Sequence, residues 1–175
     1  SAFETKDVFD HVVKTHLEHC GHRPTVIFTV SVDGAKRLTK KLCEAGIKAV
    51  AIYSQVKKKK KPTPTYRSLF DDEPTEADEI EEVVTAYDPE MPDDDDGDAK
   101  ERRRNAIKGM ESGKYTCLVN VMIATEGFDF PKLECLHIVR PTKSDALWIQ
   151  MVGRVLRLSP GKTHADVFDY LPLDD

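Results

Sequence analysis

The polypeptide has 175 residues, of which 39% are hydrophobic and 33% are charged. This length suits one domain with a substantial core. No apolar run reaches the roughly 18 residues that a membrane-spanning helix requires, and the opening residues lack a signal-peptide pattern. We therefore expect an intracellular protein without a membrane partner, and the sequence leaves cytoplasm, nucleus and mitochondrion open.

The net charge of −5 is unevenly distributed. Residues 57–98 carry six Lys/Arg and fifteen Asp/Glu, whereas the remainder carries 20 Lys/Arg and 16 Asp/Glu. The mildly basic remainder permits a polyanionic partner without requiring one.

Cysteine and histidine spacing predicts no metal site. The four cysteines are Cys20, Cys43, Cys117 and Cys135. They form no C-x-x-C pair and match no zinc motif, so we interpret them as reduced, buried thiols. The first helix carries His11, His16 and His19 without a matching cysteine or carboxylate set, and we expect surface or helix-terminal positions for them.

Helices and strands alternate in chain order outside residues 57–98. Apolar residues at helical spacing predict a first helix over 7–20, which Gly21 and Pro24 end. Short β-branched runs predict the strands. Further helices are expected at 34–46, 99–113 and 144–158, and strands at 25–30, 48–53, 115–121, 133–140 and 164–170. The expected N-caps are Asp33 and Ser144, and the expected C-terminal stops are Gly46 and Gly113.

This order of elements predicts an α/β fold. Right-handed crossovers would give a mostly parallel sheet with helices on both faces. Such sheets bind ligands at the carboxyl ends of their strands, so functional residues are expected in the loops after strands.

Residues 57–98 differ from their surroundings and read as a charged, flexible insertion within one domain of residues 1–175. A lysine run (57–61) precedes a Pro/Thr stretch and an acidic tract, within which "TEADEIEEVV" (75–84) could form a short helix. The lysines could contact phosphates, and the acidic tract could mimic a polyanion. The simpler interpretation is solvated charge that pairs loosely with itself.

The stretch "QMVGRVLR" (150–157) carries two stripes at helical spacing. The apolar stripe, expected to be buried, is Trp148, Met151, Val152 and Val155. The polar stripe is Gln150, Arg154 and Arg157, with Gly153 beside it. Guanidinium groups suit phosphate oxygens, and a glycine permits close approach of a ligand or backbone. An ordinary solvent-exposed face is the alternative.

The loop "VMIATEGFDFP" (121–131) follows a predicted strand and holds polar residues between apolar ones. Backbone amides around Gly127 could face phosphate, and Asp129 could accept a hydrogen bond from a ribose hydroxyl. A plain β-turn is the alternative.

Three stretches in this order, "VIFTVSV" (26–32), "VMIATEGFDFP" and "QMVGRVLR", resemble motifs IV, V and VI of superfamily 2 helicases. Residues 140–170 are most similar to bacterial and mitochondrial DNA-repair helicases and restriction-enzyme motor subunits. The resemblance covers nearly the whole chain except the insertion and the first twenty residues.

The resemblance implies the C-terminal, second RecA-like lobe of a two-lobe ATP-dependent helicase or translocase. ATP and Mg²⁺ would be bound mainly by an N-terminal RecA-like lobe of the same polypeptide, through a Walker A loop and a DExx box. This chain contains no G-x-x-x-x-G-K-[ST], and "DDEP" (71–74) lies in the acidic tract with no strand before it. The chain alone is therefore not expected to hydrolyse ATP.

Individual residues acquire roles from the resemblance. Arg154 and Arg157 match motif VI arginines that reach the γ-phosphate, with Arg154 the stronger candidate. Gln150 matches a residue that contacts the nucleotide or the motifs of the opposing lobe. Gly127 permits the turn, and Asp129 matches an acid near the ribose or a motif VI arginine. Without the other lobe, the arginines are expected to be solvated or disordered.

The nucleic-acid track would include Thr125 and Glu126 after the strand at 115–121, and Thr29 and Ser31 after the motif IV strand. The likeness to DNA-repair motors favours DNA over RNA. One departure is that "YSQ" (53–55) runs straight into the insertion, where relatives usually have a short glycine-containing loop. Two alternatives are a non-catalytic helicase-like module that binds nucleic acid or a partner, and an RNA helicase lobe.

Overall fold

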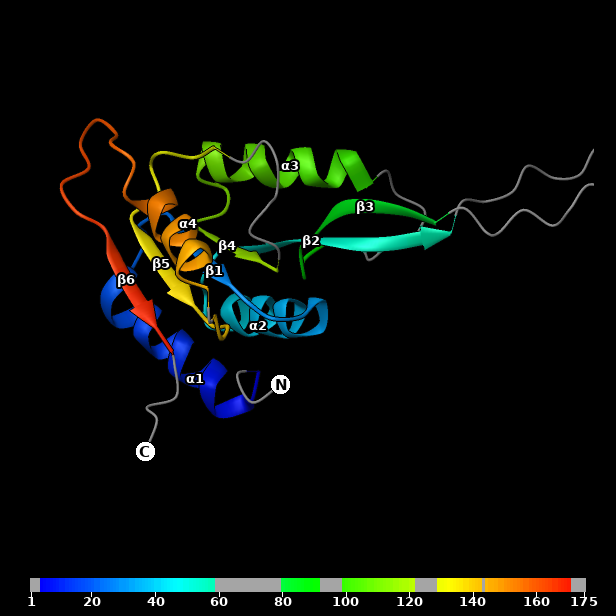
Figure 1. The fold of residues 1–175 in the computed structure, drawn as a ribbon, viewed down its shortest axis with the longest axis horizontal. Coiled ribbons are helices and arrows are strands. Elements are labelled where there is room, and N and C mark those ends of the chain that lie inside the picture. The colour runs from blue at the N-terminus through cyan, green and yellow to red at the C-terminus, as the bar shows by residue number, and fades with distance from the viewer. Residues whose placement is uncertain (1–3, 59–79, 92–98, 122–128, 143, 171–175) are drawn as a thin grey trace, which may run out of the picture.

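A computed structural model describes residues 4–58, 80–91, 99–121, 129–142 and 144–170. These residues form one six-stranded sheet in the order β3-β2-β4-β1-β5-β6 (Figure 1). The strands are β1 (Thr25–Phe28), β2 (Ala49–Lys58), β3 (Ile80–Tyr87), β4 (Cys117–Asn120), β5 (Cys135–Ile138) and β6 (Asp166–Asp169). Every neighbouring pair is parallel except β2 and β3, which are antiparallel. The predicted mostly parallel sheet is therefore confirmed.

The helices cover both faces of this sheet, as predicted. They are α1 (Lys6–Thr15), the π-helical turn η1 (His16–Cys20), α2 (Val32–Glu44), α3 (Ala99–Ser112) and α4 (Asp145–Val155). Strand residues alternate between two cores: Ile27 packs with residues of α1 and α2, whereas Val26 and Phe28 pack with residues of α3 and α4. None of the described helices is long and apolar enough to span a bilayer.

The predicted short helix over residues 75–84 is wrong where the structure describes it. Ile80–Tyr87 form β3, which pairs along β2 from Lys58↔Ile80 to Ala51↔Tyr87. Ala86 is buried in the core on the α3 side. Pairing with a neighbouring strand has overridden the weak strand preference of the local sequence, which is rich in glutamate. Residues 59–79 lie outside the described part, and the insertion boundaries of 57–98 stay a prediction.

Helix caps match the prediction at α4 but not at α2. The Ser144 hydroxyl accepts from the Leu147 amide at 3.4 Å, as expected for an N-cap. The N-cap of α2 is Ser31 rather than Asp33, because the Ser31 hydroxyl accepts from the Gly34 amide at 3.0 Å. Asp33 lies in the first turn and pairs with Arg37 at 2.8 Å.

The carboxyl ends of the central strands lie at one edge of the sheet. Phe28 is in register with Asn120 of β4 and with Ile138 of β5. The segments that follow these strands therefore leave the sheet together. Because α4 connects the parallel strands β5 and β6, it must run back from this edge toward the amino ends of the strands.

Candidate functional site

Helix α4 ends earlier than the sequence pattern predicted. The last helical residue is Val155, and the chain leaves the helix at Leu156, so Arg157 lies beyond the helix rather than on its polar stripe. Met151, Val152 and Val155 are buried, as expected. The expected burial of Trp148 is wrong, because its side chain is 39% exposed and its indole N–H donates to Asp169 at 3.2 Å.

Arg157 is paired with Asp129. Its guanidinium donates to the Asp129 carboxylate and forms an ion pair with it. The Arg157 side chain is 50% exposed, so it is solvated as expected, but the ion pair gives it a protein partner as well. The contact joins the segment that leaves α4 to the segment that leads into β5, and it brings two predicted site residues together.

Arg154 lies in a small pocket beside this pair. The lining residues, which we call the arginine pocket, are Asp129, Phe130, Leu133, Arg154 and Arg157. Burial lowers the pKa of Arg154, the Arg157 charge lowers it further, and Asp129 opposes both effects. A guanidinium stays charged despite such effects. Among these lining residues, two cations face one carboxylate in a partly desolvated hollow, an arrangement that suits an anion such as phosphate.

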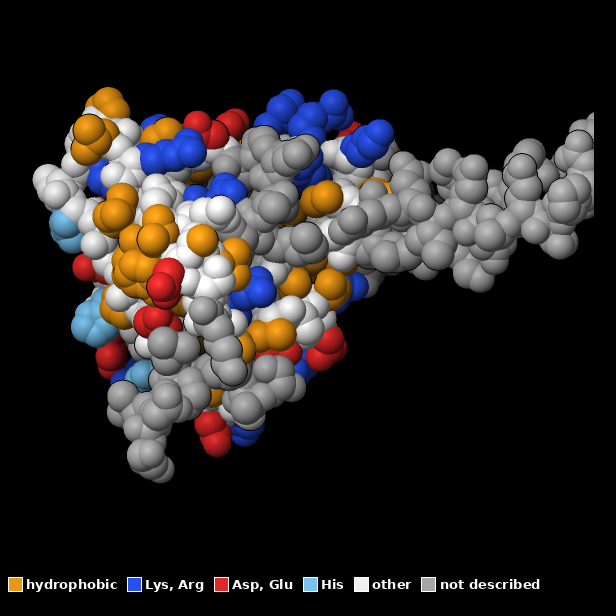
Figure 2. All heavy atoms as spheres, viewed as in Figure 1, with side chains coloured by type: hydrophobic (Ala, Val, Ile, Leu, Met, Phe, Trp, Pro, Cys, Tyr) orange, Lys and Arg blue, Asp and Glu red, His pale blue; other side chains and the backbone are white. Residues whose placement is uncertain are grey.

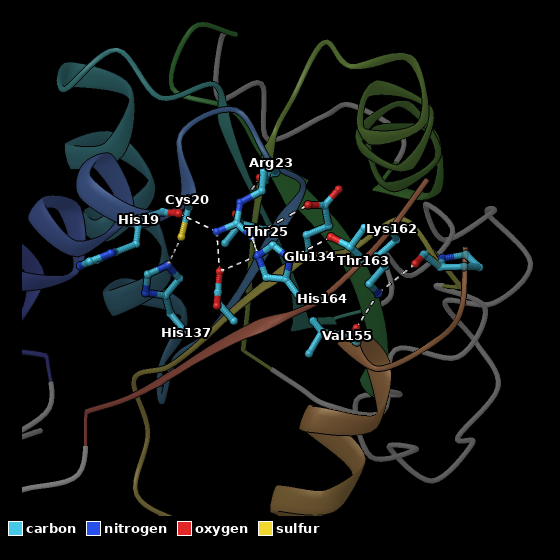
Figure 3. A network of polar contacts seen from close by, with 12 residues as sticks. His19, Cys20, Arg23, Thr25, Glu134, His137, Val155, Lys162, Thr163 and His164 are labelled. Carbon is cyan, nitrogen blue, oxygen red and sulfur yellow. Dashed lines mark hydrogen bonds and ion pairs between the residues drawn. The ribbon is translucent and has the colours of Figure 1, made fainter. Parts of the chain in front are cut away.

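Lys162 fixes the end of α4, and sequence reasoning missed it. Its ammonium group donates to the carbonyl oxygen of Val155 (Figure 3). It also donates to the carbonyl oxygens of Arg157 at 2.9 Å and of Pro131 at 3.3 Å. Lysine near a helix C-terminus satisfies carbonyls that lack intrahelical partners. The available signal was a lysine after Pro-Gly, shortly past the predicted helix end.

Arg140 is a second residue that sequence reasoning missed. It follows β5 and donates to the Val121 carbonyl at 3.1 Å, where the chain leaves β4. Three predicted site residues, Thr125, Glu126 and Gly127, belong to residues 122–128 and lie outside the described residues. The Arg140 side chain therefore binds the backbone at Val121, immediately before the segment that contains these three residues.

Neither residue expected to contact nucleic acid after β1 presents a simple exposed donor. Thr29 is fully buried, and its hydroxyl has no hydrogen-bond partner among the described residues. The Ser31 hydroxyl donates to the Glu4 carboxylate at 2.8 Å and caps α2. Glu4, which is 6% exposed, also accepts from the Ser31 amide at 2.8 Å. The Glu4 carboxylate thus binds the Ser31 hydroxyl, which was expected to donate to a phosphate.

The remaining polar residue of the predicted motif faces solvent. Gln150 is exposed one helical turn before Arg154. Gly153 is also exposed, and a Cβ atom built there would meet nothing within 4 Å. The surface beside Arg154 is therefore open to a large partner.

Residues 95–159 match the helicase conserved C-terminal domain. This range runs from the segment before α3 to just past α4 and includes the whole arginine pocket. Over these residues the chain is similar to the C-terminal domains of helicases.

Two curated yeast relatives are similar to part of the chain. The "Putative ATP-dependent helicase IRC3" of Saccharomyces cerevisiae is 44% identical over 69 residues, which are 39% of this chain. The "Putative mitochondrial ATP-dependent helicase irc3" of Schizosaccharomyces pombe is 37% identical over 68 residues, also 39% of this chain. The matched regions span 10% and 11% of the lengths of these relatives.

The fold of the chain is similar to that of the E. coli DEAD-box protein SrmB, solved in complex with a regulator of ribonuclease activity. The two chains superpose with a TM-score of 0.57 at 16% sequence identity, over 92% of this chain and 71% of the other. The predicted RecA-like α/β fold is thereby confirmed.

Proposed function

We propose that this chain is the second motor lobe of an ATP-dependent helicase or translocase that acts on nucleic acid. The observation that carries the proposal is the arginine pocket, where Arg154 and Arg157 flank the single carboxylate of Asp129. A pocket lined by two cations and one carboxylate fits phosphate oxygens, and it lies within the part of the chain that matches the helicase family.

The residues of this lobe would complete a nucleotide site shared with a second lobe. An N-terminal RecA-like lobe of the same polypeptide would hold ATP and Mg²⁺. ATP would supply the phosphoanhydride bond that is cleaved, and Mg²⁺ would neutralise most of the phosphate charge. Arg154 is half-buried, so it would present a preorganised charge to the γ-phosphate. Such an arginine stabilises charge in the transition state of phosphoryl transfer.

Arg157 and Gln150 would act beside Arg154 in different ways. The ion pair with Asp129 holds Arg157 in place, so Asp129 serves as a positioning residue for the second guanidinium. Gln150 is exposed on the same helix and could contact the nucleotide or the opposing lobe.

Apolar side chains around α4 support docking of another lobe on this side. Ile149, Leu156 and Leu158 are 62%, 61% and 96% exposed. Figure 2 shows hydrophobic side chains gathered over α4 and the loop that follows it. Exposed apolar surface next to a charged pocket is typical of an interface that another domain covers.

The nucleic-acid track remains a proposal based on the helicase resemblance. Thr125, Glu126 and Gly127 would contribute to it after β4, and we favour DNA because residues 140–170 resemble DNA-repair motors. One relative is mitochondrial by name, which supports an intracellular location. Competition between DNA and RNA strands of equal sequence in an ATPase assay would decide the polymer.

The experiment that tests the proposal is Arg154→Ala in the full-length protein. We expect ATP turnover to fall by about 10³-fold or more, the magnitude typical of an arginine finger, while nucleic-acid affinity is retained. The matched control is Arg104→Ala, because Arg104 lies exposed on α3 and pairs only weakly with Glu101 at 4.0 Å. Normal turnover in the Arg154→Ala protein would refute the assignment.

A further inference from the structure

A buried cluster of metal-binding side chains lies on the opposite face of the sheet from the arginine pocket. His16, Cys20 and His137 each offer one ligand atom, and these three atoms all lie within 4.8 Å of one another. His16 and Cys20 come from η1, and His137 comes from β5. All three residues are at most 2% exposed. The cysteine and histidine spacing did not predict this arrangement.

The distances approach those of a tetrahedral zinc site. The Cys20 Sγ atom lies 3.3 Å from His137 Nε2 (Figure 3). A sulfur and a nitrogen bound to one tetrahedral Zn²⁺ lie roughly 3.5 Å apart, given bonds of about 2.3 and 2.0 Å. The other distances among the three ligand atoms, all within 4.8 Å, would have to shorten by at most about 1.5 Å.

His16 is poorly satisfied as an ordinary buried histidine. Neither of its ring nitrogens makes a well-formed hydrogen bond to the described residues, and the Gly21 backbone gives it only a weak polar contact. A buried imidazole whose two ring nitrogens lack a hydrogen-bond partner among the described residues is chemically suited to bind a metal ion.

The local backbone turns these ligands inward. The amide of Gly21 donates to the His16 carbonyl at 3.1 Å, five residues back, which closes the π turn. Single π turns are frequent at functional sites in helical proteins. Here the turn places both His16 and Cys20 in the interior, at the end of a helix that could have continued with regular α geometry.

Cys135 is suited to be the fourth ligand. It lies two residues before His137 on β5, so both side chains point to the same face of the sheet. Its thiol lies near that of Cys20, but Cys135 is not among the three residues whose ligand atoms all lie within 4.8 Å of one another, so its side chain would have to turn toward the ion. Two thiolates would neutralise the charge of a buried divalent cation, which removes the main obstacle to placing it in an apolar interior.

Tyr170 orients the histidine on β5. The His137 Nδ1 atom and the Tyr170 hydroxyl are 2.8 Å apart, which leaves Nε2 directed at Cys20. A second hydrogen bond of this kind fixes the tautomer and orientation of metal-bound histidines in many proteins.

We propose that His16, Cys20, Cys135 and His137 form a structural Zn²⁺ site that joins the first helix to β5. Binding would form two Zn–S and two Zn–N bonds and release the two thiol protons to solvent. A closed set of four protein ligands leaves no position for substrate, so the ion would stabilise the fold rather than take part in ATP hydrolysis.

Zinc content and cobalt substitution test this site in the 175-residue chain. We expect about one zinc per chain after reconstitution of the reduced chain with Zn²⁺, and about two protons released per ion. Replacement with Co²⁺ should give the sulfur-to-cobalt charge-transfer and d–d bands of tetrahedral coordination. Cys20→Ser should weaken Zn²⁺ binding by more than about 100-fold, and Tyr170→Phe by about 10-fold.

The matched control is Cys43→Ser, because Cys43 is only half-buried and its thiol donates to the Ala49 carbonyl instead. This variant should keep full metal content. Circular dichroism of the metal-free variants separates loss of a ligand from loss of the fold, and Tyr170→Phe retains all four ligands. The proposal is overturned by a reduced wild-type chain that binds no zinc, by equal zinc affinity in Cys20→Ser, or by a Cys20–Cys135 disulfide in the purified chain.

Discussion

Arg157 donates to the carboxylate of Asp129, which lies 28 residues earlier in the chain. Both side chains are at least half exposed, at 50% and 63%. An exposed pair of this kind contributes little to folding stability, so its importance should lie in holding the Arg157 guanidinium in one place.

Asp129→Asn should therefore separate positioning from stability. We expect the free energy of unfolding to change by less than about 1 kcal/mol. In the full-length protein, ATP turnover should fall by about 100-fold, since a small displacement of a catalytic group can have this effect. Urea unfolding and steady-state ATPase assays measure the two quantities, and unchanged turnover would contradict a positioning role for Asp129.

Lys162→Met should destabilise the chain while keeping the length of the side chain. The carbonyl oxygens of Val155, Arg157 and Pro131 would lose their common donor. Because this region is partly solvated, we expect a loss of about 1 kcal/mol, the low end for unsatisfied polar groups. Lys132→Met on the exposed neighbouring turn should stay within about 0.5 kcal/mol of wild type. Equal urea midpoints for the two variants would argue against the capping role.

Two glycine-to-alanine substitutions should have opposite effects on stability. Gly153 lies in α4 with open space around it, so alanine should stabilise the isolated chain by about 0.5–1 kcal/mol. A Cβ atom at Gly109 of α3 would lie 2.3 Å from the Tyr115 ring, so alanine there should cost about 1–3 kcal/mol despite its helix preference. Thermal unfolding measures both changes.

The Gly153→Ala variant also tests whether another lobe approaches α4 closely. In the full-length protein, we expect the same substitution to lower ATP turnover while the isolated chain is stabilised. A stabilised full-length enzyme with wild-type turnover would mean that the open surface beside Gly153 is not used.

Replacing residues 59–79 with Asn-Gly should preserve the fold. Lys58 and Ile80 are paired across the antiparallel strands β2 and β3, so a two-residue turn can join them. We expect the same circular dichroism spectrum and a closely similar unfolding midpoint. Loss of cooperative unfolding would show that the removed residues support the sheet.

The same variant tests whether the insertion contacts nucleic acid. Each lost phosphate contact should reduce the slope of log affinity against log salt by about 0.7–0.9. If the nucleic-acid affinity and its salt slope are unchanged in the full-length protein, residues 59–79 do not contribute to nucleic-acid binding. Removing all of 57–98 is a poorer experiment, because it also deletes β3 and its buried Ala86.

Local periodicity predicted most elements because it records which side of an element faces the core. The stripe of Met151, Val152 and Val155 identified the buried face of α4 correctly. The end of that helix was not predictable in this way, since Leu156 and Leu158 continue the apolar pattern while Lys162 ends the helix through contacts distant in sequence. The position of Arg157 depends on that ending.

Two other features could be recognised only in the folded chain. The stretch 80–84 favours a helix by composition, but pairing with β2 makes it a strand. His16 and Cys20 showed no metal-site spacing because their neighbour His137 is 117 residues beyond Cys20. Spacing motifs find ligands only when they are close in sequence, and this cluster is assembled by the sheet.

The contact between Cys20 and His137 also sets an order of events during synthesis on the ribosome. The first helix leaves the exit tunnel long before β5 has been made, and its apolar residues Phe9 and Val12 share a core with residues of α2 and of the earlier strands. Its partners His137 and Tyr170 come at the end of the chain. The buried polar side chains of the N-terminal segment therefore acquire their final neighbours only after β5, β6 and Tyr170 have been synthesised.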